Sequence, residues 1–108
     1  MTDAEKLVLV KEQLNITDSE LDTKLSAYLS MAAQEILSWY YTNRGGVPAN
    51  ATVPYKYEIT QVQAVVIGYS QYGAEGEIAH NENGIHRRFR YENMVAYIRA
   101  NVYPLIGI

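Results

Sequence analysis

The chain has 108 residues, of which 48% are hydrophobic, and a formal net charge of −3. This length fits a single domain, residues 1–108, that buries roughly two thirds of the surface of its unfolded chain. The absence of cysteine excludes disulfides, thiolate metal sites and thiol nucleophiles. We expect a soluble domain, because no signal-like segment opens the chain and no apolar run approaches the roughly 20 residues of a membrane span.

The N-terminal residues predict a short helix. Thr2 and Glu5 have the spacing of a capping box, in which the threonine oxygen accepts a helical N–H and the glutamate bonds back to the cap. The helix should end near Leu14, and its inward face should carry Leu7, Val10 and Leu14.

A second capping box, Thr17 to Glu20, predicts the start of a long helix. Ile16 before the cap could also close a hydrophobic staple with Leu21. The helix should run to about Asn43, with Gly45 available for its left-handed end. Its expected inward face recurs at steps of three to four residues: Leu21, Leu25, Leu29, Ala32, Ile36 and Tyr40.

Residues 43–53 contain glycine, proline and small polar side chains, which is typical of a loop. Pro54 suits the first turn of a third helix, which should continue to Gly73. Gly68 inside that helix predicts close packing against another element. The expected inward face follows helical spacing: Tyr55, Ile59, Val62, Val66, Tyr69 and Tyr72.

Residues 77–90 predict a protruding β-hairpin, because Asn83-Gly84 is the preferred dipeptide of a two-residue hairpin turn. The resulting register places Glu77 opposite Arg90. It also places three apolar side chains on one face: Ile78, Ile85 and Phe89.

A last helix is predicted after the hairpin and should stop before Pro104, with apolar residues Met94, Val95, Ile98 and Val102. The tail that follows is apolar and usually needs a partner or a groove: Leu105, Ile106 and Ile108. The sequence therefore predicts a mainly α fold, a small bundle of about four helices, two of them long, with one hairpin.

Charge is distributed unevenly. Residues 1–40 carry a net charge of −4 and the remainder +1, with Arg87, Arg88 and Arg90 nearly contiguous. An acidic surface of one copy could therefore meet a basic surface of another. Ten tyrosines accompany one phenylalanine, and tyrosine is enriched at protein interfaces, although most of these rings could simply border the core.

No catalytic pattern emerges, so we expect neither an enzyme nor a bound cofactor or metal. His80, Glu82 and His86 are close in sequence, but the hairpin register puts His86 on the opposite face from the other two. Residues 68–72 begin like a nucleophile elbow but lack its second glycine and a preceding strand. Gly45-Gly46 lacks the spacing and the lysine of a phosphate-binding loop.

The run from His86 to Tyr91 leaves one alternative open. Cations interleaved with aromatic rings can hold phosphates and stack bases, so the chain could be a small regulatory domain that binds nucleic acid through the hairpin. The overall negative charge opposes this interpretation, because it repels a polyanion elsewhere on the surface.

The order of these parts resembles the head-tail connector family of tailed bacteriophages. The resemblance rests on Leu14 to Thr17 leading into a long helix, a second long helix after Pro54, Gly76-Glu77 opening a segment centred on Asn83-Gly84, and a short last helix. It covers nearly the whole chain and depends on the combination of these parts.

The resemblance implies a structural virion subunit, made in the host cytoplasm and placed in the neck of the particle. Copies would join head to tail into a ring of about 12, contacting the portal protein and the next tail-completion protein. DNA would pass through the lumen without specific binding. The residues expected to contact partners are Arg87, Arg88, Phe89, Arg90, Tyr91, Leu105, Ile106 and Ile108.

Overall fold

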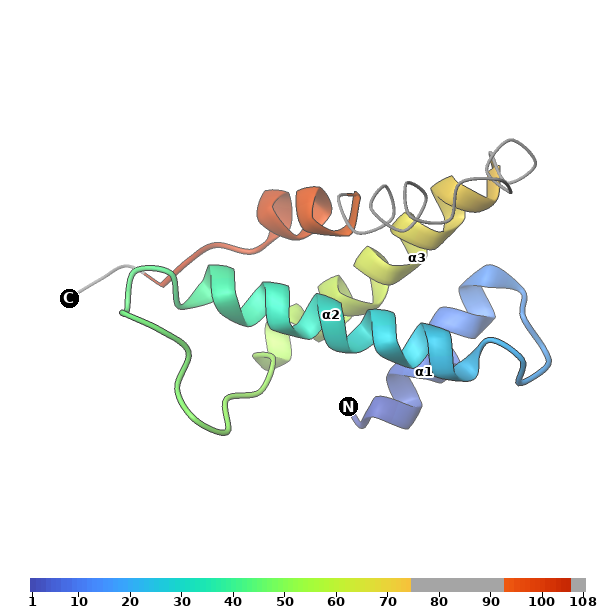
Figure 1. The fold of residues 1–108 in the computed structure, drawn as a ribbon, viewed down its shortest axis with the longest axis horizontal. Coiled ribbons are helices and arrows are strands. Elements are labelled where there is room, and N and C mark those ends of the chain that lie inside the picture. The colour runs from blue at the N-terminus through green and yellow to red at the C-terminus, as the bar shows by residue number, and fades with distance from the viewer. Residues whose placement is uncertain (75–92, 106–108) are drawn as a thin grey trace.

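The computed structural model describes residues 1–74 and 93–105, and the regular structure in those ranges is entirely helical (Figure 1). Helix α1 spans Asp3–Leu14, α2 spans Asp22–Tyr40, and a 3₁₀ turn, η1, over Tyr55–Tyr57 continues into α3, Glu58–Ala74. A last helix covers residues 93–101. The mainly α prediction is confirmed for this part of the chain, whereas the predicted hairpin at 77–90 lies outside the described residues.

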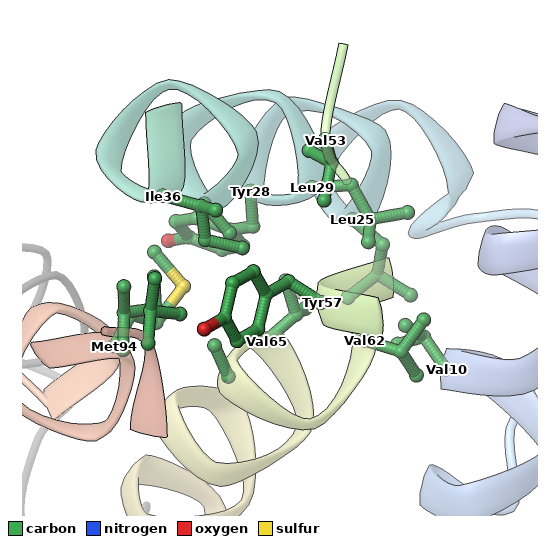
Figure 2. Close-up of a cluster of buried hydrophobic side chains, with 14 residues drawn as sticks. Val10, Leu25, Tyr28, Leu29, Ile36, Val53, Tyr57, Val62, Val65 and Met94 are labelled. Atoms are coloured by element: carbon green, nitrogen blue, oxygen red, sulfur yellow. The ribbon is translucent and has the colours of Figure 1, made fainter. Parts of the chain in front are cut away.

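Helix α2 runs along the long axis, with α1 and the 15–21 turn towards one end and the loop 41–54 towards the other (Figure 1). The core is continuous, and all four α-helices contribute to it, so the described residues pack around a single apolar centre (Figure 2). The buried members are Val10, Leu25, Tyr28, Leu29, Ala32, Ile36, Val53, Tyr57, Val62, Ala64, Val65, Met94, Ile98 and Val102.

The predicted boundaries of α1 are confirmed. Glu5 N–H donates to Thr2 Oγ1 at 3.1 Å, and Thr2 N–H donates to Glu5 Oε1 at 2.7 Å, which completes the capping box. At the other end Asn15 adopts a left-handed conformation with φ 59°, and Ile16 N–H donates to Lys11 O at 2.9 Å. These local bonds end the helix before any tertiary contact is needed.

The predicted start of α2 at Thr17 is wrong, because the helix begins at Asp22. Asp18 Oδ1 accepts the N–H of Glu20 at 3.1 Å, and Asp22 N–H donates to Ser19 O at 3.2 Å. The Asp18 carboxylate thus stabilises a tight turn in place of a helical one, as short acidic side chains commonly do. Lys11 Nζ then binds Asp22 Oδ1 at 2.7 Å and holds the first residue of α2 against α1.

The predicted apolar face of α2 is confirmed, and the helix ends three residues earlier than expected. Tyr40 O accepts the N–H of Leu105 at 2.9 Å, so a contact distant in sequence accompanies the helix end. Tight turns follow, and Gly45, with φ 79°, adopts the left-handed conformation that suits glycine within them.

The predicted inward face of α3 is partly wrong. Tyr55 and Ile59 are 89% and 52% exposed, whereas Tyr57, Gln61 and Val65 are buried. The 3₁₀ turn has three residues per turn, so spacing extrapolated backwards from α3 assigns the wrong tyrosine to the core. Within α3 itself apolar residues occur on several sides, so spacing alone does not decide which side packs.

The prediction of a last helix before Pro104 is confirmed. Met94, Ile98 and Val102 are at most 2% exposed. Met94 lies in the cluster beside Ile36 and Tyr28, on the opposite side from Val10 (Figure 2). The last helix therefore lies on the side of the core away from Val10 of α1 (Figure 2).

We predict that burial decides the effect of identical substitutions at two isoleucines. Ile36→Ala should lower the free energy of unfolding by about 2–5 kcal/mol, because it leaves a cavity in the core. Ile59→Ala, at a half-exposed site, should cost less than about 1 kcal/mol. Urea titrations followed by circular dichroism measure both, and equal losses would contradict the assigned face of α3.

Candidate interaction surfaces

Four hydrogen bonds to residues distant in sequence hold the segment after the last helix. Trp39 Nε1 donates to Val102 O at 2.9 Å, and Tyr103 N–H donates to Tyr57 Oη at 3.1 Å. Leu105 N–H donates to Tyr40 O at 2.9 Å, and Leu105 O accepts from Asn43 Nδ2 at 3.2 Å. We call the four residues that hold the segment, Trp39, Tyr40, Asn43 and Tyr57, the C-terminal anchor.

Aromatic and cation–π contacts pack the side chains around the C-terminal anchor. The Tyr40 and Tyr57 rings meet edge to face with centroids 5.8 Å apart, and Tyr41 meets Tyr40 at 5.1 Å. The Arg99 guanidinium lies 5.0 Å from the centre of the Trp39 ring and binds Glu35 Oε2 at 3.1 Å. The chain therefore reaches Leu105 at a fixed place beside the end of α2.

Of the predicted contact residues, the structure places Leu105, which is half-buried on this anchor. The others lie outside the described residues: Arg87, Arg88, Phe89, Arg90, Tyr91, Ile106 and Ile108. The histidines considered for a metal site, His80 and His86, and Glu82 lie outside them as well. Residues 68–69 of the rejected nucleophile pattern are part of α3, as the helical interpretation required.

A buried polar network joins three helices. Lys6, 6% exposed, donates from Nζ to Gln61 Oε1 at 2.7 Å, and Gln61 Nε2 donates to Leu29 O at 2.8 Å. Glu58 Oε2 lies 3.9 Å from Lys6 Nζ and is also largely covered. Both ends of the Gln61 amide are satisfied, so its burial carries no unpaired polar atom.

The network lies beside a cleft of about 600 Å³ between α1, α2 and the residues preceding α3. The α2 side of the cleft is formed by small or apolar side chains, with Ser26, Ser30 and Ala33 among them. No serine, histidine and carboxylate constellation converges in it, and Lys6 is already paired. Across residues 1–74 and 93–105, no three potential metal-ligating side chains cluster.

Sequence reasoning missed Lys6 and Gln61, because charged and amide side chains are normally assigned to solvent. The available signal was the four-residue step from Lys6 to Val10, which places the lysine on the buried stripe of α1. Tyr57 was missed because the 3₁₀ turn shifts the register ahead of α3.

None of the helices in the described ranges has the length and apolar character required to cross a bilayer. The family model of phage gp6-like head-tail connector proteins matches residues 5–101. The chain belongs to this family. No curated protein and no solved structure matches it.

Connector proteins of this family are structural and non-enzymatic, and they act at the junction between head and tail. The resemblance inferred from the order of the elements is thereby confirmed. Membership of the family implies interaction with head and tail components of the phage. It is a protein of the virion head-tail interface.

We predict that the buried Lys6 contributes more stability than the partly buried Lys11 on the same helix. Lys6→Met should cost about 1–3 kcal/mol, because Gln61 loses its partner while remaining buried. Lys11→Met removes a more accessible pair with Asp22 and should cost at most about 1 kcal/mol. Denaturant titrations measure the free energy of unfolding of both variants. Adding Gln61→Leu to Lys6→Met should cost less than the sum of the single changes.

We predict that the Tyr57 hydroxyl retains the C-terminal segment on its anchor. Tyr57→Phe removes the acceptor of Tyr103 N–H, so amide hydrogen exchange at Tyr103 and Leu105 should accelerate about five-fold or more. Tyr55→Phe is the matched control, since Tyr55 is 89% exposed, and it should leave both rates unchanged. Equal rates in the two variants would contradict the anchoring role.

Proposed function

We propose that this chain is the subunit of a closed ring that joins the capsid portal to the tail and conducts phage DNA. The match to the connector family over residues 5–101 is the observation that carries the proposal. The ring would hold about 12 copies joined head to tail, with the portal protein on one side and the next tail-completion protein on the other. The subunit would be made in the host cytoplasm and would end in the neck of the virion.

Head-to-tail assembly needs two different complementary patches on each subunit. The net charge of −4 in residues 1–40 and of +1 in the remainder favours such an arrangement. The residues proposed to contact neighbouring subunits, portal or tail are Arg87, Arg88, Phe89, Arg90, Tyr91, Leu105, Ile106 and Ile108. The C-terminal anchor supports the apolar part of this set, because it fixes the backbone at Leu105, directly before Ile106.

A conduit should let DNA pass without holding it. The formal net charge of −3 suits that requirement, since binding to the DNA backbone depends on neutralising its phosphates with lysine and arginine. In this proposal the three clustered arginines meet protein carboxylates, which removes them from contact with the polyanion.

Electron micrographs of negatively stained particles test the ring directly. The full chain, mixed with purified portal complex of the same phage, should give rings stacked on the portal. Portal particles that carry no added density at saturating concentrations of the chain would contradict the proposal.

We predict that reversing the arginine cluster blocks this assembly. The variant with Arg87, Arg88 and Arg90 changed to glutamate should lose binding to the portal complex and to other copies, because attraction to carboxylates becomes repulsion. Circular dichroism should show unchanged helicity. Sedimentation velocity and micrographs report the assembly.

The control reverses the same number of charges elsewhere, at Lys24, Arg44 and Lys56. It should assemble, since the proposed contacts remain. Normal assembly by the arginine variant would reject the charge part of the proposal, and equal loss by the control would assign the effect to net charge alone.

A further inference from the structure

The outward side of α1 is an apolar strip bordered by carboxylates. Ala4, Glu5, Val8, Leu9 and Glu12 line an open depression of about 500 Å³, together with the N-terminal residue. Val8, in the middle of the helix, is 53% exposed. We call these five residues the α1 outer face.

Both lysines of α1 point away from this face. Lys6 Nζ is buried against Gln61 and Glu58, and Lys11 Nζ binds Asp22 at 2.7 Å. No lysine or arginine therefore lines the depression, and the ammonium of Met1, which borders it, is already paired with Glu58 Oε2 at 3.1 Å. Glu5 uses one oxygen, Oε1, to cap the helix, while Glu12 forms no side-chain bond or ion pair within the described part of the chain.

We propose that the α1 outer face receives residues 85–91 of a second copy of this chain. The inference rests on the proposed ring function, and it identifies the α1 outer face as the surface that accepts the arginine cluster of a neighbouring copy. Residues 85–91 combine three arginines with Ile85, Phe89 and Tyr91, so they offer cations for the carboxylates and apolar groups for the strip. Three of the five arginines of the chain lie in this run.

A second copy fits better than the same copy. Met94, three residues after Tyr91, lies across the core from Val10, and the α1 outer face points away from that core (Figure 2). Three residues span at most about 11 Å, so this restriction applies to the Tyr91 end of the run, whereas Ile85, nine residues before Met94, has a reach of about 30 Å. A contact between two different patches of identical subunits is the heterologous kind that generates rings.

A peptide titration tests the contact. A synthetic peptide of residues 85–91, blocked at both ends, is added to the ¹⁵N-labelled full chain up to millimolar concentration. Amide shifts should concentrate between Ala4 and Glu12. Shifts confined to other elements, or no shifts at all, would overturn the inference.

Matched variants of the full chain separate specific docking from general attraction. Glu12→Lys should weaken the peptide about five-fold, whereas Glu20→Lys, the same charge change in the turn before α2, should not. Val8→Gln should also weaken it, because the apolar contact is lost while helix propensity is kept. Equal weakening by Glu20→Lys would reduce the effect to nonspecific electrostatics and reject the docking site.

The outcome is distinguishable from a failure of the ring function. If the wild-type chain forms rings on the portal but the peptide leaves α1 unperturbed, the acceptor surface lies elsewhere and the ring function stands. If the peptide binds α1 as described and no rings form, the ring function fails while the contact between copies remains.

Discussion

The orientation of α1 about its own axis determines which of its charged side chains face the core and which lie on the surface. Lys6 reaches inward to the Gln61 amide, which in turn bonds to Leu29 O, and Lys11 reaches sideways to Asp22. These contacts tie α1 to α3 and to α2. Because Lys6 is buried and Lys11 is paired with Asp22, Glu5, Glu12 and Val8 form an outer surface without a lysine.

A buried lysine is a costly way to join helices, since the ammonium group must leave water. Its hydrogen bond to Gln61 and the neighbouring Glu58 offset that cost, and the partner atoms fix one relative placement of three helices. In a connector subunit such a defined placement has a use. In the proposed ring, the repeated interfaces would require every copy to present the same patches at the same angles.

The other end of the domain is organised by aromatic rings. Tyr40, Tyr57 and Trp39 hold the backbone of residues 102–105 by packing and by hydrogen bonds. This explains part of the high tyrosine content. Tyr57 is a core residue with a hydrogen-bonded hydroxyl, whereas Tyr55, two positions earlier, is exposed and has no role in the core.

Features set by local bonds were predictable from the sequence. The capping box of α1 was correct because Thr2 and Glu5 satisfy each other within one turn. A similar capping pattern at Thr17 gave a wrong prediction, because the Asp18 carboxylate accepts the N–H of Glu20 and stabilises a turn in place of a helix start. The capping pattern is compatible with a helix start at Thr17 and with a turn there. The contact of Lys11 with Asp22 is consistent with the turn.

The sequence by itself determined the helical class, the buried stripe of α2, the last helix and the connector family, because spacing and order survive without coordinates. Only the tertiary structure decided which side of α3 is buried, that Lys6 lies inside, and that the segment before Leu105 is anchored beside Tyr40. Each of these depends on atoms 32 or more residues apart in the chain, with the satisfied Gln61 amide as the clearest case. Local pattern carries no information about such partners, and their hydrogen bonds outweigh the usual preference of polar side chains for water.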